Sequence, residues 1–254
     1  MSAGQATTWL RRRQPTGAPV QLVCFPHAGG SASYYFPVAR MLAPHVDVLA
    51  VQYPGRQDRR SEPFIDSIDE LAENIVPELL PLTDRPFALF GHSMGATLAF
   101  EVARRLQEQG ATAIEVFASG RRAPSAHREE RTHVTDERII TDLRALSGTN
   151  SRFLADDEML RMVLPAIRND YKAAETYRYQ PGPRLTMPIT ALIGEQDPKV
   201  TIAEAQQWEQ HTSDRFELLS FTGGHFYLND HIASITSLIT ERLRAGVTRF
   251  TDNC

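Results

Sequence analysis

A serine, an aspartate and a histidine stand along this chain in an arrangement that could form a nucleophilic site. Ser93 is the centre of a Gly-x-Ser-x-Gly pentapeptide, Asp197 follows an apolar segment, and His225 follows a pair of glycines. A histidine can take the proton of a serine hydroxyl, and a carboxylate can orient the resulting imidazolium. These residues predict acyl transfer through a covalent intermediate on Ser93, with His225 as the base and Asp197 as its supporting acid.

The pentapeptide around Ser93 follows the apolar run 87–90 and precedes small residues at helical spacing. We expect a strand, a sharp turn and a helix start, with Ser93 held in a strained conformation at the turn. Gly91 and Gly95 lack a Cβ, so the strand and the helix can pass close to the turn. Ser93 Oγ would project from the sheet, and the N–H of Met94 would face a developing oxyanion. An ordinary strand-to-helix turn with an exposed serine is the alternative.

A second oxyanion donor is expected from the glycine-rich loop His27-Ala28-Gly29-Gly30, which follows the apolar run 20–25. Glycines let backbone N–H groups point into open space, and folds with a serine elbow take their second donor from a loop in this place. We assign that role to the N–H of Ala28. A plain connecting loop or a phosphate-binding loop is the alternative, but neither G-x-x-x-x-G-K-[ST] nor G-x-G-x-x-G is present.

The chain order of the three residues narrows the interpretation. Ser93, Asp197 and His225 each follow an expected strand, and Ser-Asp-His is the order of α/β hydrolases rather than of other serine-triad folds. Glu195 is a rival for the acid, whereas the strand 114–119 is followed by no acidic residue. Two further histidines, at positions 27 and 92, are expected to shape their turns rather than act as bases.

The elements that must position these residues alternate between strands and helices, which predicts a mostly parallel sheet flanked by helices. This is an α/β fold of the α/β-hydrolase type, with a core of residues 1–120 and 185–254. Strands are expected at 20–25, 46–51, 87–90, 114–119, 189–193 and 216–221. Helices are expected at 33–42 and 66–80, after Ser93 as far as Gly110, after the capping box 201–204, and at 230–245.

The alternation breaks between residues 121 and 184, where the sequence is polar, rich in arginine and helical in period. We expect a helical lid inserted between two late strands, with one helix at 135–146 and another from 156, kinked or restarted at Pro165. An apolar acyl chamber would lie beneath it, lined by Met159, Met162 and Ile167, because methionine adapts to different acyl chains. An extra packing layer without a role in substrate access is the alternative.

Composition excludes several classes of protein. The chain has 254 residues, 42% of them hydrophobic, and a net charge of −4, which suits one α/β domain. No apolar run is long enough for a membrane span or a signal peptide. Arg11-Arg12-Arg13 is expected to be a solvated start rather than a nucleic-acid arm. The cysteines, Cys24 and Cys254, predict neither a metal site nor a disulfide, and favour the cytoplasm. The chemistry requires no metal and no organic cofactor.

Several motifs together resemble the stand-alone type II thioesterases of polyketide and nonribosomal peptide synthesis, over nearly the whole chain. They are Phe25 to Gly30, Gln52-Tyr53-Pro54-Gly55-Arg56, Gly91-His92-Ser93-Met94-Gly95, Leu143 to Thr149, Leu164 to Tyr179 and Gly223-Gly224-His225-Phe226. The resemblance implies an acyl thioester substrate, carried on the phosphopantetheine arm of an acyl or peptidyl carrier protein domain. It implies an editing role, the removal of stalled or misloaded acyl groups, with arginines of the lid meeting an acidic carrier.

Three alternatives remain open at this point. The chain could be another acyl-ester hydrolase, a cyclising thioesterase domain of a larger synthase, or a non-catalytic protein that binds carriers. The chain starts at Met1 without a carrier-like sequence before it, and no triad member is missing, so we expect a stand-alone enzyme. We also expect a monomer that binds neither nucleic acid nor membranes, although the residues do not decide its oligomeric state.

Overall fold

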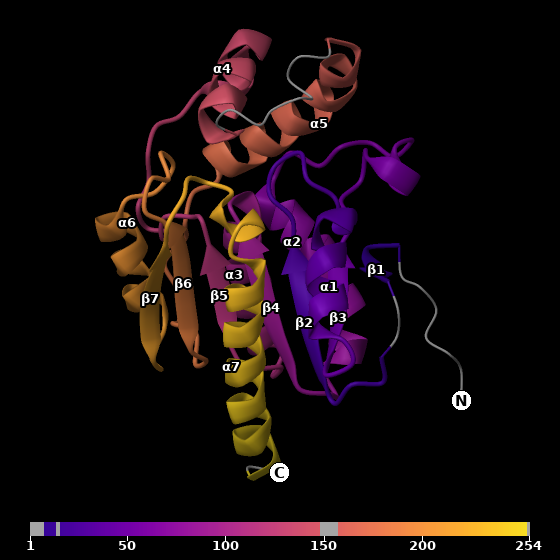
Figure 1. The fold of residues 1–254 in the computed structure, drawn as a ribbon, viewed down its shortest axis with the longest axis vertical. Helices are drawn as coiled ribbons and strands as arrows, with labels where there is room; N and C mark the ends of the chain where they lie inside the picture. Colours follow the sequence, from indigo (N-terminus) through magenta and orange to yellow (C-terminus); the bar gives the residue numbers. More distant parts are fainter. Residues whose placement is uncertain (1–7, 14–15, 148–156, 253–254) are drawn as a thin grey trace.

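The structure, a computed structural model, describes residues 8–13, 16–147 and 157–252 of the chain. Within these ranges the strands form one seven-stranded sheet in the order β1-β3-β2-β4-β5-β6-β7 (Figure 1). Only β1 runs antiparallel to its neighbour, and all other neighbouring strands in the described sheet are parallel. The strands are β1 (Leu10–Arg12), β2 (Val20–Phe25), β3 (Val46–Val51), β4 (Phe87–His92), β5 (Val116–Ser119), β6 (Ile189–Gly194) and β7 (Phe216–Phe221).

Helices cover both faces of this sheet (Figure 1). Helices α2 (Ile68–Leu79) and α3 (Met94–Glu108) bury apolar side chains on one face, and α1 (Phe36–Leu42) and α7 (Ile232–Asp252) on the other. The remaining helices are α4 (Asp136–Ser147), α5 (Asp157–Thr176) and the short α6 (Ile202–Gln206). Short 3₁₀ turns occupy Ala32–Tyr35, Gln57–Arg59, Leu80–Leu82, Thr132–Val134, Gln207–His211 and Tyr227–Asn229.

The parallel strands bring the predicted site residues to one edge of the sheet. Side chains of β2 to β6 are buried along their whole length, as expected for strands covered on both faces. Five of these parallel strands, β2, β4, β5, β6 and β7, end at the same edge, where loops 26–31, 93, 120–121, 195–199 and 222–226 follow. In open α/β sheets this carboxyl edge is where functional groups are placed. The α/β fold predicted from the sequence is confirmed.

Helices α4 and α5 lie above this carboxyl edge (Figure 1). They pack on each other through an apolar cluster of Ile139, Leu143, Leu160, Leu164 and Ile167. The described part of 121–184 forms no strand, and β5 and β6 on either side of it are neighbours in the sheet. Helix α5 continues through Pro165 without a restart. A kink or a restart was expected because proline removes one backbone hydrogen bond, and the continuous helix excludes the restart.

Of the three arginines expected in a solvated start, Arg13 is exposed, whereas Arg11 and Arg12 are only partly exposed. Arg11 and Arg12 belong to β1, which pairs with β3 along Leu10–Arg12. The Arg12 guanidinium lies 3.3 Å from the buried carboxylate of Asp47, and Arg11 pairs with Asp58. Charged side chains on a short edge strand hinder pairing with a second chain. Arg11 and Arg12 are therefore explained by the edge of the sheet.

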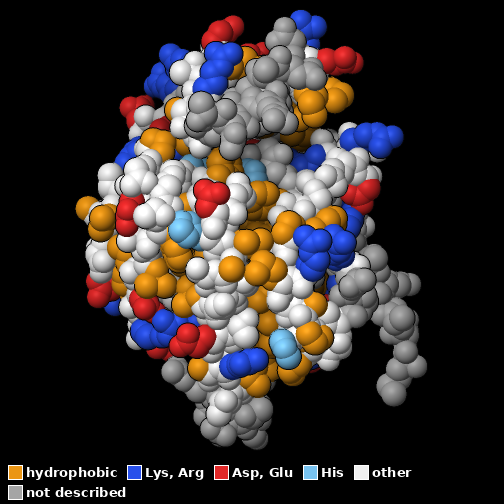
Figure 2. All heavy atoms as spheres, in the orientation of Figure 1, with side chains coloured by type: hydrophobic (Ala, Val, Ile, Leu, Met, Phe, Trp, Pro, Cys, Tyr) orange, Lys and Arg blue, Asp and Glu red, His pale blue; other side chains and the backbone are white. Residues whose placement is uncertain are grey.

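The face that carries α1 and α7 shows hydrophobic side chains across its middle and charged ones toward its margins (Figure 2). A hollow of about 290 Å³ lies between these two helices, lined mainly by apolar groups that include Val38, Phe90 and Ile235. Isolated apolar surface of this kind is normal for globular proteins. In the part of the chain that the structure describes, no helix is long and apolar enough to cross a membrane.

Candidate active site

Ser93 sits at the turn between β4 and α3 with a backbone φ of 55° and ψ of −121°. This is a conformation that a residue with a side chain rarely adopts, so the strained turn predicted from the sequence is confirmed. The turn is closely surrounded: a Cβ on Gly91 would lie 2.0 Å from the Gly95 carbonyl oxygen, and one on Gly95 would lie 2.0 Å from the Phe25 carbonyl oxygen. Glycine is required at both positions because backbone fills that space.

The imidazole of His225 is paired with Asp197, as the chain order predicted. Its Nδ1 lies 2.8 Å from Asp197 Oδ2, and both side chains are almost completely buried. The other carboxylate oxygen, Oδ1, accepts a hydrogen bond of 2.8 Å from the backbone N–H of Lys199. Glu195, the rival acid, is exposed. The structure therefore joins His225 to Asp197 and fixes the orientation of the carboxylate from two sides.

The loop at 27–30 lies beside the turn at Ser93, and residues 52–56 hold this loop through hydrogen bonds. Tyr53 OH donates to the Pro26 carbonyl over 2.9 Å, and Arg56 donates to the Gly30 carbonyl over 3.2 Å. Among the described residues, neither the N–H of Ala28 nor that of Met94 donates to a protein acceptor. Both residues line the same cavity as Ser93, which is consistent with the predicted role of their N–H groups.

Two other histidines lie close to His225 and are held neutral. Their ring centroids form a chain, with 5.9 Å between His27 and His92 and 5.0 Å between His92 and His225. Burial, reinforced by the positive charge of protonated His225, lowers the pKa of His27 to about 3 and that of His92 well below its usual range. His92 Nδ1 lies 3.0 Å from Ser119 Oγ. Both rings therefore pack in their turns as neutral groups at neutral pH.

The cavity beside Ser93 combines reactive, charged and apolar groups. Its volume is about 30 Å³, which is room for very few water molecules. Its wall consists of Ala28, Ser93, Met94, Arg121, Glu130, Leu146, Tyr171, Ala174, Glu175, Lys199 and His225. Burial, followed by repulsion from Arg122, lowers the pKa of Arg121 to about 10, so it remains a cation at neutral pH. The residues predicted as nucleophile, base and oxyanion donors all line this cavity, and Asp197 contacts His225 from outside it.

Comparison with known proteins identifies the family. A family model for the thioesterase domain matches residues 20–243. The chain belongs to the thioesterase family. It is 51% identical over 240 residues to a "Probable cadicidin biosynthesis thioesterase" of Streptomyces griseus, and this match covers 94% of this chain and 66% of that protein. It is 50% identical over 239 residues to "Thioesterase PikA5" of Streptomyces venezuelae, which covers 92% of this chain and 85% of that protein.

A solved structure agrees with these relatives. The type II thioesterase BorB from the borrelidin biosynthetic cluster superposes with a TM-score of 0.89 at 52% identity. The match covers 94% of this chain and 99% of BorB. The resemblance to type II thioesterases that the sequence motifs indicated is therefore confirmed for this member of the thioesterase family.

The apolar chamber expected beneath the lid of this thioesterase differs from the observed cavity. Met159 and Met162 are 49% and 70% exposed, and neither lines the cavity beside Ser93. They lie on the side of α5 that turns away from its buried face, which carries Leu160, Leu164 and Ile167. Ile167 is buried and approaches the loop at 27–30, because a Cβ on Gly29 would lie 2.5 Å from Ile167 Cγ1. In this conformation the two methionines lie outside the cavity, and their place in an acyl chamber stays a prediction.

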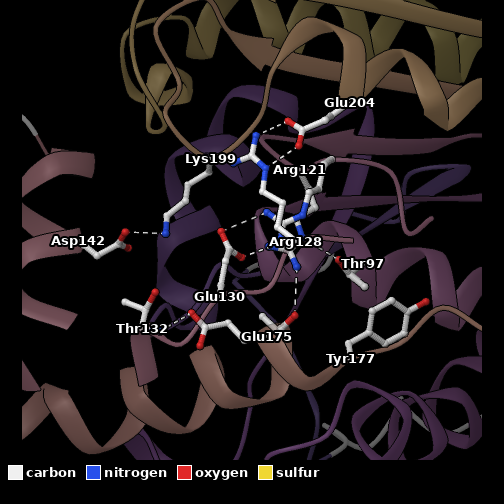
Figure 3. Close-up of polar contacts among 12 residues, drawn as sticks. Thr97, Arg121, Arg128, Glu130, Thr132, Asp142, Glu175, Tyr177, Lys199 and Glu204 are labelled. Carbon is white, nitrogen blue, oxygen red and sulfur yellow. Dashed lines mark hydrogen bonds and ion pairs between the residues drawn. The ribbon is translucent and has the colours of Figure 1, made fainter. Parts of the chain in front are cut away.

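The cavity wall contains charged residues that sequence reasoning missed. In Figure 3, Arg121 lies near Glu130 and Glu175, and Lys199 points toward Asp142 of α4. Arg121 Nε donates to Thr97 Oγ1 over 3.1 Å, and Lys199 Nζ lies 2.6 Å from Asp142 Oδ1. No short motif marks these residues, since they come from separate segments. The only available signal was the density of charge in 121–131 directly after β5.

Proposed function

We propose that this thioesterase hydrolyses acyl thioesters on the phosphopantetheine arm of a carrier protein. The reaction would remove stalled or misloaded acyl groups during polyketide or nonribosomal peptide synthesis. The observation that carries the proposal is that Ser93, His225, Met94 and Ala28 line one cavity, while Asp197 holds His225 from behind. The names of the relatives, which are biosynthetic thioesterases, support the carrier-bound thioester as the substrate.

In the proposed reaction Ser93 Oγ attacks the thioester carbonyl while His225 takes the hydroxyl proton. The negative charge on the carbonyl oxygen is held by the N–H groups of Met94 and Ala28, and Asp197 stabilises the imidazolium. The carbon–sulfur bond breaks, and the phosphopantetheine thiolate receives the proton from His225. Water then attacks the acyl-enzyme with His225 as base again, which releases the carboxylic acid and restores the Ser93 hydroxyl.

Metal and organic cofactors have no part in these steps, since the chain, the thioester and water supply every group. Among the described residues there is no cluster of three or more side chains that could hold a metal ion. The cavity as it stands is too small for an acyl chain, so α4 or α5 must move to admit one. This supports residues 121–184 as a lid on the core of 1–120 and 185–254. The cytoplasmic location and the monomeric state stay predictions.

The proposal is tested by comparing three substrates with the same acyl group. They are the acyl group on the phosphopantetheine of an acyl carrier protein, on free pantetheine, and in a matched oxygen ester. We expect the highest kcat/KM for the carrier-bound thioester, because the carrier contributes binding that the small substrates lack. A higher kcat/KM for the oxygen ester would identify an esterase. Binding of the acylated carrier without turnover of any substrate would identify a non-catalytic binding protein.

A further inference from the structure

A buried carboxylate on α5 reaches the loop that carries Ala28. Asp170 Oδ2 accepts a hydrogen bond of 2.7 Å from the backbone N–H of Gly29. The same oxygen accepts from Arg56 over 2.6 Å, and Oδ1 accepts from the second nitrogen of the Arg56 guanidinium over 2.9 Å. Asp170 is 1% exposed and Arg56 is 8% exposed. The contact therefore joins α5, the 52–56 segment and the 27–30 loop through one buried ion pair.

The hydrogen bond to Asp170 engages the N–H of Gly29, which is next in sequence to the Ala28 N–H assigned to the oxyanion. Gly29 has a φ of 75°, so its peptide N–H is directed by a turn that a residue with a side chain rarely forms. Gly30 N–H closes the turn on the His27 carbonyl over 2.9 Å. With the N–H groups of Gly29 and Gly30 both engaged, the N–H of Ala28 is the one in this loop segment that remains available to the cavity.

Arg56 completes the support from the opposite side. Its guanidinium donates to both oxygens of Asp170 and to the Gly30 carbonyl at 3.2 Å. A bidentate pair of this kind fixes direction as well as distance. Because the attraction of Asp170 outweighs the cost of burial, the pKa of Arg56 is raised, and the guanidinium remains charged. The carboxylate is therefore held in the one orientation in which Oδ2 meets the Gly29 N–H.

We propose that Asp170, oriented by Arg56, is a positioning residue that sets the direction of the Ala28 N–H toward the oxyanion. The proposal rests on the proposed function, because it assumes an oxyanion forms beside Ser93. It makes the lid helix part of the catalytic geometry: α5 would hold the oxyanion loop through Asp170 while other parts of the lid move. An ion pair that only stabilises the fold would leave the oxyanion donors unchanged.

The test uses a substrate pair that differs only at the atom the oxyanion donors touch. One member is an acyl-pantetheine thioester, and the other is the matching dithioester, in which sulfur replaces the carbonyl oxygen. Sulfur is larger and a weaker hydrogen-bond acceptor, so the ratio of kcat/KM for thioester over dithioester reports the fit of the donors. A loss of folded enzyme lowers both values equally and leaves the ratio unchanged.

Asp170→Ala removes both acceptor oxygens. We expect kcat for the thioester to fall by about 10²-fold with KM almost unchanged, the lower end of what loss of one oxyanion donor costs. The ratio between the substrates should fall as well, because the dithioester sulfur accepts hydrogen bonds weakly and loses less when the donor is misdirected. Asp170→Asn keeps one oxygen that can accept from Gly29, so its ratio should lie between those of Asp170→Ala and the wild type. This graded order is the rescue that a purely structural role does not predict.

Asp170→Ala leaves the Arg56 charge unpaired in the interior, which threatens folding. The double variant Arg56→Met/Asp170→Ala removes both charges and still deprives Gly29 of its acceptor, so it should show the same low ratio. Asp66→Asn is the matched control. Asp66 pairs with Lys172, which lies on α5 as Asp170 does, but this ion pair is exposed. The ratio for Asp66→Asn should equal that of the wild type.

An unchanged ratio in both Asp170→Ala and the double variant would overturn the positioning role and leave the proposed function intact. A wild-type enzyme that does not hydrolyse the thioester would instead refute the proposed function. The two failures are therefore separate.

Discussion

Replacing Asp197 with asparagine should disable the base without removing any side chain from the site. The carboxylate accepts from the Lys199 N–H at Oδ1 and meets His225 Nδ1 at Oδ2, each over 2.8 Å. Asparagine has only one oxygen in these two places. The Lys199 N–H can only donate, whereas either nitrogen of a neutral imidazole can accept. We therefore expect the amide oxygen to face Lys199 and the amide NH₂ to face His225.

The imidazole of His225 would then carry its proton on Nε2 and accept at Nδ1. In that tautomer it presents an N–H to the nucleophile and cannot take the proton of Ser93. The same change in serine proteases lowers kcat about 10⁴-fold, so transfer of that value predicts about 5.5 kcal/mol of added barrier here. Packing should change little, because the two side chains have nearly the same shape.

The assay compares kcat of Asp197→Asn with that of Glu195→Gln on an acyl-pantetheine thioester, with unfolding curves for both variants. Glu195 lies two residues earlier and is exposed, so its amide should retain kcat within a factor of about 2, as surface changes do. If Glu195→Gln were the slower variant, the acid would have to be reassigned to Glu195. Equal losses in the two variants would refute the tautomer argument.

Three further changes have defined outcomes. Leu146→Ala enlarges the cavity beside Ser93 and should raise kcat/KM for long acyl chains relative to short ones. Met162 is exposed, so Met162→Trp should leave the ranking of acyl chains unchanged. The same ranking in both variants would place acyl selection elsewhere. Gly95→Ala would bring a Cβ to 2.0 Å from the Phe25 carbonyl oxygen, so urea titration should show a loss of about 1–3 kcal/mol or more, and no loss would contradict the close approach. Burial lowers the pKa of His211 to about 4, so the unfolded chain takes up a proton first as the pH falls below about 6.5, and stability declines toward pH 4. Between pH 7 and 5, the free energy of unfolding measured by urea titration should fall by about 1 kcal/mol less in His211→Gln than in the wild type, after allowance for solvent screening. An equal fall in both proteins would refute burial of His211 as the cause.

The strands and the serine elbow could be predicted because their signals are local. The bounds expected for β2, β3 and β7 agree with the structure, since each is a short apolar run between turn residues. The elbow is local for the same reason: Gly91 and Gly95 are needed within two residues of Ser93. The partnership of Asp197 with His225 followed from chain order, because parallel strands deliver their loops to one edge.

The features that were missed depend on partners far apart in the sequence. Strand β1 has three residues, too few for a period, and Arg12 finds the buried carboxylate of Asp47 only after the sheet forms. Asp170 belongs to no short motif, and its proposed role depends on a hydrogen bond from Gly29, which lies about 140 residues earlier in the chain. The exposure of Met162 on α5 could not be predicted either, because helical period does not say which side of a helix meets a cavity.

Covalent acylation of Ser93 by an acyl group delivered on phosphopantetheine can be measured directly. The experiment follows a single turnover of an acylated carrier protein with wild-type enzyme and with Ser93→Ala, using intact-protein mass spectrometry. The wild-type enzyme should gain an acyl mass that maps to Ser93 and then decays. Ser93→Ala should show no added mass and no deacylation above background, with carrier binding retained. Deacylation by Ser93→Ala near the wild-type rate would show that Ser93 is not the nucleophile.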